Sequence, residues 1–272
     1  MKDKTRATKK ASEAAERPSP RSPSVVFGIG ILVLLGTGLL SAALAEKGIG
    51  KVALCAFFTE WMSGRAGVPW SDPAEPRPAG KTVALRIARA LGLAAGIALA
   101  SVLAGLAAGA LTARGQTTSP EGLLFSFLSA AFSGMRAELT EHGLVFAMLF
   151  PLVHALPNTK RWYVLVLVGA AASLAGALGR GETGLMIAAS GCVGALTSAL
   201  WSVDKGAFRA VAVRGGLAFF LGSFVRLGPV AVMAGGKSAL ATSPEASVFV
   251  CLCALAALSL VRPGTHARSV GA

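Results

Sequence analysis

Charged residues, cysteine, histidine and tyrosine are all scarce in this chain of 272 residues. Only 14% of its residues are charged and 54% are hydrophobic, which excludes both a water-soluble globule and a disordered chain. Four cysteines, with no C-x-x-C pair among them, are too few for a disulfide scaffold and lie in apolar runs. Aromatic residues reach only 7%, whereas Ala, Gly and Leu dominate, so the expected helices pack closely through small residues.

Acidic residues are half as frequent as basic ones, 13 against 26, which gives a net charge of +13. The basic residues gather in the tails and between apolar stretches, where anionic lipid headgroups and the positive-inside rule account for them. No stretch interleaves basic with aromatic residues as a nucleic-acid groove requires. The expected partner of this charge is therefore the lipid bilayer, and no nucleic acid is expected.

Apolar stretches recur along the chain and predict an all-α polytopic integral membrane bundle of about six to eight transmembrane helices. The first, Val25–Ala45, has 21 residues and no charge, so it reads as a retained anchor. The basic tail before it places the N-terminus in the cytoplasm, at the plasma (inner) membrane. Further spans are expected at 90–111, 162–178, 184–201 and 246–261, with interrupted apolar stretches at 122–157 and 207–234. The expected organisation is a basic disordered tail at 1–24, N-terminal membrane helices at 25–121 with a linker at 64–82, a core at 122–220, C-terminal membrane helices at 221–261 and a tail at 262–272.

Four ionisable residues fall within seven positions, between apolar stretches of 14 and 15 residues: Arg136, Glu138, Glu141 and His142. Ionisable groups at membrane depth are costly and are candidates for function. On a helix, Glu138 and His142 are four apart and share a face. A carboxylate beside an imidazole is a plausible general base that activates a water. The alternative is a solvated loop between two short helices.

A metal site at this cluster would need a further ligand from another helix, and the chain has three histidines in all. We therefore expect no metal and no cofactor. Arg214 interrupts an apolar stretch and has two interpretations. It either snorkels to the membrane interface, which we favour, or pairs with Glu138 across the bundle.

The stretch from Met135 to Phe146 resembles the first motif of the CAAX protease and bacteriocin-processing (CPBP) family of intramembrane proteases. That motif has two adjacent glutamates, three residues, Arg-Gly and an apolar run. Glu138 falls on the second glutamate and Gly143 on the glycine, while Ala137 and His142 replace the first glutamate and the arginine.

Later positions match the family only in part. Its Phe-x-x-x-His motif is present as Phe150 to His154, one helix early, and the His and Asn of its last motif helix fall on Arg214 and Ala218. The resemblance covers roughly residues 122 to 220. It implies that Glu138 activates the water that attacks a peptide bond, with His142 and His154 in support and Glu141 secondary.

A second stretch, Ala188 to Leu196, is similar to the serine motif of rhomboid proteases, in which a Gly-x-Ser-Gly turn opens a small-residue helix. The only histidine after Ser190 is His266, in the C-terminal tail, so no base is expected for this serine. Ser190 is interpreted as a packing residue.

The leading hypothesis is an intramembrane endopeptidase of CPBP type, possibly weakened, that cleaves a membrane-anchored protein or peptide. The alternative is a non-enzymatic membrane protein, either a pseudoprotease that acts as a scaffold or a small permease. The two classes differ in what they require of the Glu138 carboxylate.

Overall fold

The computed structural model describes residues 80–261, except 116–118, 144, 147–148, 150–155, 183, 205–206 and 226–229, with short pieces between 22 and 61. Most of the predicted first span 25–45, nearly all of both tails, most of the linker 64–82 and the candidate residue His154 lie outside the described residues.

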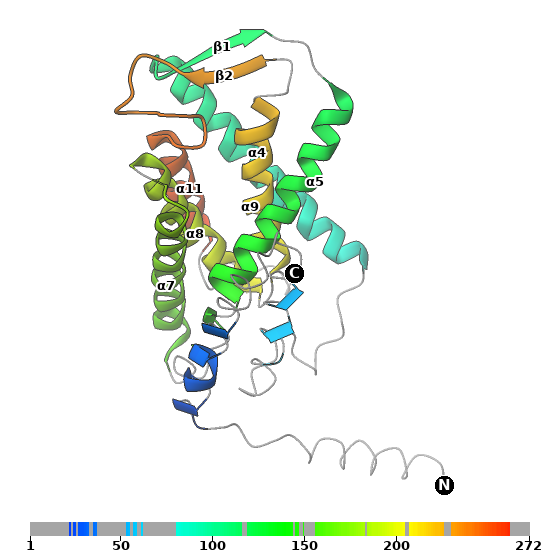
Figure 1. Cartoon of the computed structure of the whole chain (residues 1–272), viewed down its shortest axis with the longest axis vertical. Coiled ribbons are helices and arrows are strands. Elements are labelled where there is room, and N and C mark those ends of the chain that lie inside the picture. The colour runs from blue at the N-terminus through cyan, green and yellow to red at the C-terminus, as the bar shows by residue number, and fades with distance from the viewer. Residues whose placement is uncertain are drawn as a thin grey trace, which may run out of the picture.

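Helices make up most of the described chain, in the order shown in Figure 1. The helices are α4 (Gly80–Ala107), α5 (Pro120–Ala137), η1 (Glu138–Gly143), α7 (Asn158–Gly179), α8 (Leu185–Asp204), α9 (Phe208–Leu217), η2 (Ala218–Phe224) and α11 (Val248–Leu260), where η marks a π-helix. The strands are β1 (Leu111–Gly115) and β2 (Val230–Ala234).

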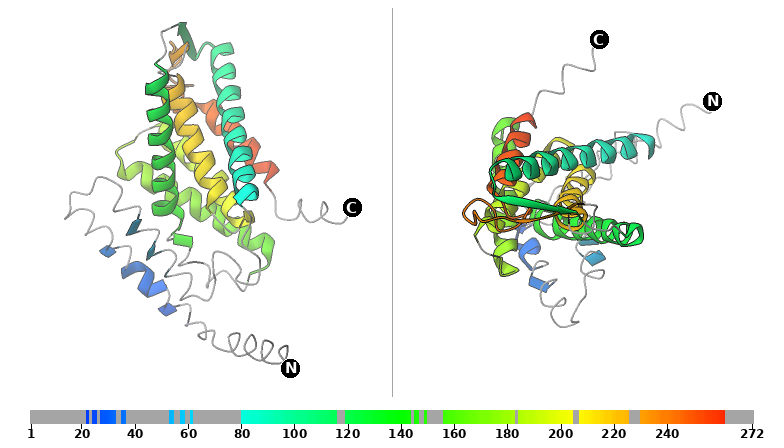
Figure 2. Two further views of the ribbon diagram at one scale, coloured as in Figure 1. Left: turned by 90° about the vertical axis from the view of Figure 1, so that its right-hand side faces the viewer. Right: turned by 90° about the horizontal axis from the view of Figure 1, so that it is seen from above.

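The helices pack as two groups that meet at their central members. α9 contacts both α4 and α5, and α8 contacts both α7 and α11. α8 then packs against α9, and α11 packs against α4, which joins the groups. Figure 2 shows α4, α5 and α9 side by side, with α7 inclined to them. Helix η1 continues α5 and contacts α7, so the charged cluster enters the bundle between the two groups.

Three described helices are long and apolar enough to cross a membrane: Gly80–Ala107, Lys160–Gly179 and Leu185–Val203. α11 is apolar but shorter. These helices support a mostly helical membrane protein. The structure begins α4 ten residues before the predicted Ala90, and these first turns carry Lys81, Arg86 and Arg89.

The prediction that every apolar stretch is helical is wrong at two places. β1 and β2 form an antiparallel two-stranded sheet in which Leu111 lies opposite Ala234 and Gly115 opposite Val230. The predicted spans 90–111 and 207–234 both end inside it. The helix before β1 stops at a turn where Gly109 has φ 66°, and the paired strands satisfy each other's backbone groups without a helix.

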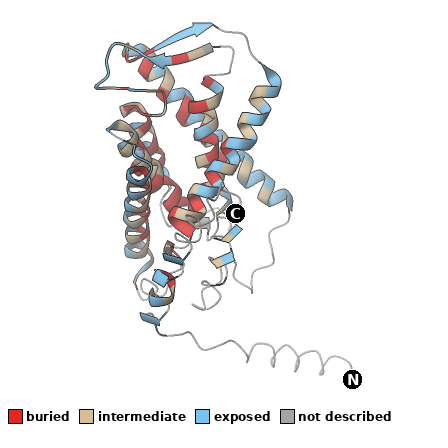
Figure 3. Ribbon diagram, in the orientation of Figure 1, coloured by how far each residue is buried: buried red, intermediate tan, exposed pale blue. Residues whose placement is uncertain are grey.

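Small residues bring the helices close together, as the composition predicted. The buried residues gather along the inner faces of α4, α8, α9 and α11 (Figure 3), and many are alanines. On α7 and α8, a Cβ added to Gly169 would strike Ser198, and one added to Gly194 would strike Ser173. This close approach lets short polar side chains of α7 and α8 meet residues of η1.

Replacement of Gly134 by alanine is expected to lower the free energy of unfolding by about 1–3 kcal/mol, because overpacking forces backbone to move. Its Cβ would lie against the backbone of Gly215, where α5 crosses α9. The matched control is Gly96→Ala in α4, where nothing lies within 4 Å of the added Cβ. Unfolding of both variants in detergent tests this, and equal stability of the two would contradict the close crossing.

Candidate functional site

Glu138 and His142 form a buried pair at the end of α5. The helix begins at Pro120, after Ser119, whose hydroxyl accepts a hydrogen bond from Gly122 N, and it passes at its C-terminal end into the π-helix η1. His142 Nδ1 lies 2.7 Å from Glu138 Oε2, and both side chains are 0% exposed. The i, i+4 pairing predicted from the sequence is present. The alternative of a solvated loop is wrong for these residues, and only Arg136 of the predicted cluster faces outward.

The Glu138 carboxylate is surrounded by donors from other helices. Trp201 Nε1 of α8 donates to Oε2 at 2.9 Å, and Arg214 Nη1 of α9 donates to Oε1 at 3.3 Å. The neighbouring hydroxyl of Thr197 donates to the carbonyl oxygen of Gly194 at 3.3 Å. A carboxylate has about four acceptor positions, and His142, Trp201 and Arg214 occupy three of them.

The second ring nitrogen of His142 faces acceptors. Nε2 lies 3.0 Å from the carbonyl oxygen of Gly169 and 3.1 Å from Ser173 Oγ. Ser173 directs its own proton to Glu141 Oε2, and Ser198, 3.5 Å from Nε2, directs its proton to the carbonyl of Gly194. Nε2 therefore has to donate, while Nδ1 donates to the carboxylate. This pattern fits a doubly protonated, positively charged imidazolium.

Arg214 joins the two carboxylates of η1 from the opposite side. Its Nη1 reaches Glu138 and its Nη2 reaches Glu141 Oε2, while its side chain is 11% exposed. The interpretation that Arg214 snorkels to the interface is wrong, and the pairing with Glu138 across the bundle is correct. A planar guanidinium suits this position because its fork of donors spans two acceptors.

Glu141 connects the buried cluster to the bundle surface. Besides Arg214 and Ser173, it accepts a hydrogen bond from Arg180 Nη1 at 2.7 Å, just beyond the end of α7. Arg180 also pairs with Glu182 at 2.7 Å. Burial lowers the pKa of Arg180, but its hydrogen bonds to Glu182 and Glu141 outweigh this and hold that pKa above its usual value.

Glu138, Glu141, His142 and Arg214 form the inner cluster, and their charges balance. Glu138 and Glu141 carry two negative charges, and Arg214 and the imidazolium of His142 carry two positive ones. Burial of ions is costly unless each has a partner and its donors and acceptors are filled, which is the case here. The cluster ties η1, α7, α8 and α9 together at one point.

The sequence predicts Ser190 to be a packing residue, and the structure gives it a polar partner as well. Ser190 is half-buried, and its hydroxyl donates to Glu182 Oε2 at 3.3 Å, while the neighbouring Gly191 packs against Leu174 of α7. Ser173, Trp201 and Arg180 belong to the cluster but carried no motif signal. A search of the described residues finds no group of three or more His, Cys, Asp or Glu side chains arranged to hold a metal ion.

An apolar cavity of about 360 Å³ lies beside the cluster between α4, α5 and α9. Leu139 and Gly215 line it, each next in sequence to a charged residue of the cluster, but Glu138, His142 and Arg214 do not. The charged side chains therefore point away from this cavity and into the bundle.

Comparison with known proteins adds no relative: no protein-family model matches the chain, and neither a curated protein nor a solved structure matches it.

Proposed function

We propose that this chain is a non-enzymatic integral membrane protein, a scaffold in which a structural charge cluster fills the place of a protease site. Its CPBP-like core spans residues 122–220. We infer six to eight transmembrane helices, an N-terminus in the cytoplasm and a location in the plasma (inner) membrane. The three long apolar helices and the uncharged stretch 25–45 support this topology.

One observation carries the proposal: Glu138 is fully buried, and three protein donors, from His142, Trp201 and Arg214, hold its two oxygens. A glutamate that activates water needs that water within about 2.6–3.2 Å and a free lone pair to take the proton. A water that reaches Glu138 has to enter a fully buried site, and beside Oε2 it would displace Trp201 or His142. Each displacement would leave a buried charge or a buried indole N–H without its partner.

The charge state of His142 supports the same proposal. An imidazolium that donates from both nitrogens has no lone pair, so it cannot accept a proton from water. Its ring stacks on Phe146, with ring centroids 5.5 Å apart and an interplanar angle of 9°, and Phe146 is itself buried. His142 is thus placed to balance charge and to fill space between η1, α7 and α8.

The second candidate is the CPBP-type endopeptidase that cleaves a membrane-anchored protein or peptide. The observation that favours it is the 2.7 Å contact between the Glu138 carboxylate and His142, the residue pair that the family resemblance singles out. An apolar cavity lined by Leu139 lies beside the charged cluster, although Glu138 and His142 do not line it. Catalysis would then require a rearrangement that moves Arg214 away from Glu138.

The two candidates differ in the new protein N-termini that appear in membranes holding the chain. We would compare membranes with the wild-type chain, with Glu138→Gln and without the chain, and sequence all N-termini by mass spectrometry. A scaffold gives the same set of N-termini in every sample. The matched control is Arg136→Gln, which removes a charge from the same helix end on its exposed side.

A set of N-termini that depends on the wild-type chain and on Arg136→Gln, but is lost in Glu138→Gln at equal abundance, would overturn the scaffold proposal. That result would establish the endopeptidase instead. Equal abundance matters because the scaffold proposal itself expects Glu138→Gln to destabilise the protein.

A further inference from the structure

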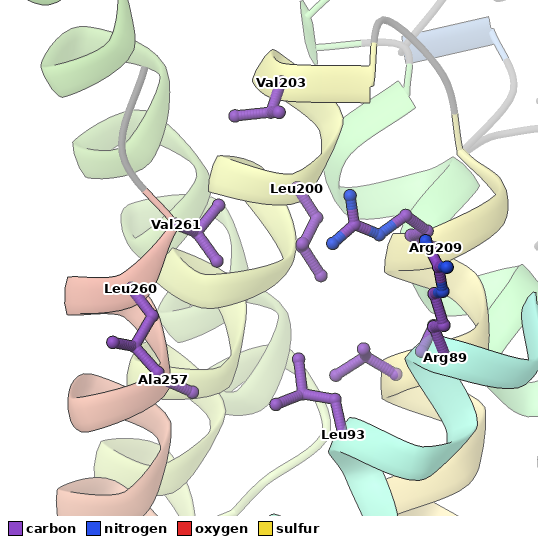
Figure 4. Close-up of a pocket in the computed structure, with 10 residues that line it drawn as sticks. Arg89, Leu93, Leu200, Val203, Arg209, Ala257, Leu260 and Val261 are labelled. Carbon is purple, nitrogen blue, oxygen red and sulfur yellow. The ribbon is translucent and has the colours of Figure 1, made fainter. Parts of the chain in front are cut away.

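A second cavity, of about 250 Å³, lies between α4, α8, α9 and α11, and no side chain of the charged cluster lines it. Figure 4 shows Arg89 and Arg209 along one wall, opposite Leu260 and Val261. The other lining residues that the structure describes are all apolar, and none of them is a carboxylate. The cavity thus combines two guanidinium groups with apolar walls.

Arg89 and Arg209 both line the cavity, so an anion inside it is attracted to both guanidinium groups. Arg89 is exposed, and Arg209, which is half-buried, also interacts within the protein. A guanidinium carries five N–H donors, so an existing interaction leaves donors for a ligand. The fork of each guanidinium matches two oxygens of a phosphate, which an ammonium matches less well.

The cavity lies at the basic end of the bundle. Lys81 and Arg86 are in the first turns of α4, and Lys160 and Arg161 begin α7. Trp162 follows them and belongs to the same apolar cluster as Leu258 and Val261 near the end of α11. Basic residues with a neighbouring tryptophan are typical of the membrane–water interface, so we expect the cavity to lie at headgroup depth.

We propose that this cavity binds the phosphate of an anionic glycerophospholipid, held by Arg89 and Arg209, with its acyl chains against the apolar wall. Leu260 at the wall is 77% exposed, so an apolar surface leads from the cavity to the bilayer. A net negative headgroup is preferred over a zwitterionic one because no carboxylate in the lining attracts a choline. The site is independent of the charged cluster and of any catalysis.

Native mass spectrometry of the purified full chain tests this, with phosphatidylglycerol and phosphatidylcholine of identical acyl chains offered in equal amounts. We expect at least a tenfold preference for phosphatidylglycerol. The double variant Arg89→Gln/Arg209→Gln should lose most of that preference. Arg86→Gln is the matched control, because Arg86 lies about one turn before Arg89 on α4 but does not line the cavity.

Two results would overturn the proposal: no preference between the two lipids in the wild type, or an equal loss of preference in Arg86→Gln and in the double variant. A third arm adds inorganic phosphate. Phosphate that binds with the same dependence on Arg89 and Arg209, while neither lipid does, would mean a free-anion site and not a lipid site. If the double variant fails to fold, the single Arg89→Gln, at an exposed side chain, must still lower the preference.

Discussion

Glu138→Gln is expected to lower the free energy of unfolding by about 3 kcal/mol, because removal of one partner from a buried ion pair leaves an uncompensated charge. The amide keeps the shape of the side chain, but the inner cluster then holds one negative charge against the positive charges of His142 and Arg214. The amide has only one acceptor oxygen, so it cannot accept from both Trp201 Nε1 and Arg214 Nη1, which contact different oxygens of the carboxylate.

The double variant Glu138→Gln/His142→Gln tests how strongly Glu138 and His142 are coupled. Both charges are absent, the inner cluster stays neutral, and two amides four residues apart can hydrogen-bond. At least half of the lost stability should return, which a double-mutant cycle on unfolding in mixed micelles measures. Additive losses from the two single variants would show that the pair is not coupled. A fully stable Glu138→Gln variant would favour the endopeptidase, whose base is not needed for folding.

The local part of the site could be predicted from the sequence. The spacing of Glu138 and His142 and the apolar stretches around them were enough to expect a shared face. The prediction holds although η1 is a π-helix, because its wider turn still brings these two side chains within 2.7 Å. The sequence did not predict which of the charged residues are buried. Arg136 faces outward, whereas Glu138, Glu141 and His142 are buried.

The partners from distant parts of the chain could not be predicted. Arg214 is separated from Glu138 by 76 residues, and its choice between lipid interface and bundle interior depends on how α9 crosses α5. That crossing rests on Gly134 and Gly215, whose contact no periodicity reveals. Ser173 and Trp201 are ordinary residues of apolar helices until α7 and α8 dock on η1.

The sheet of β1 and β2 was missed for a related reason. Its strands lie more than a hundred residues apart, and each reads locally as the end of an apolar stretch. Hydropathy indicates that a segment is buried or lies near lipid. It does not indicate which backbone groups become the hydrogen-bond partners of that segment. Only the tertiary arrangement places β2 beside the end of α4.

Arg214→Gln is the variant with the second large expected effect, a loss of about 3 kcal/mol, because two buried carboxylates lose their shared cation. Arg214→Lys keeps the charge but offers one ammonium in place of a fork, so it cannot hold Glu138 and Glu141 together as well. We expect it to lose about 1–2 kcal/mol. Arg180→Gln is the control. Its side chain is 40% exposed, and loss of a solvent-screened pair costs about 1 kcal/mol or less.

Unfolding in mixed micelles should therefore rank the variants Arg180→Gln, Arg214→Lys and Arg214→Gln in order of increasing loss. The rescue variant Arg214→Gln/Glu141→Gln removes one charge of each sign and should recover more than half of the loss. It leaves Glu138 with His142 and Arg180 with Glu182. An Arg214→Gln protein as stable as the Arg180→Gln control would mean that Arg214 does not hold the carboxylates. The charged cluster would then not hold η1, α7, α8 and α9 together, as the scaffold proposal requires.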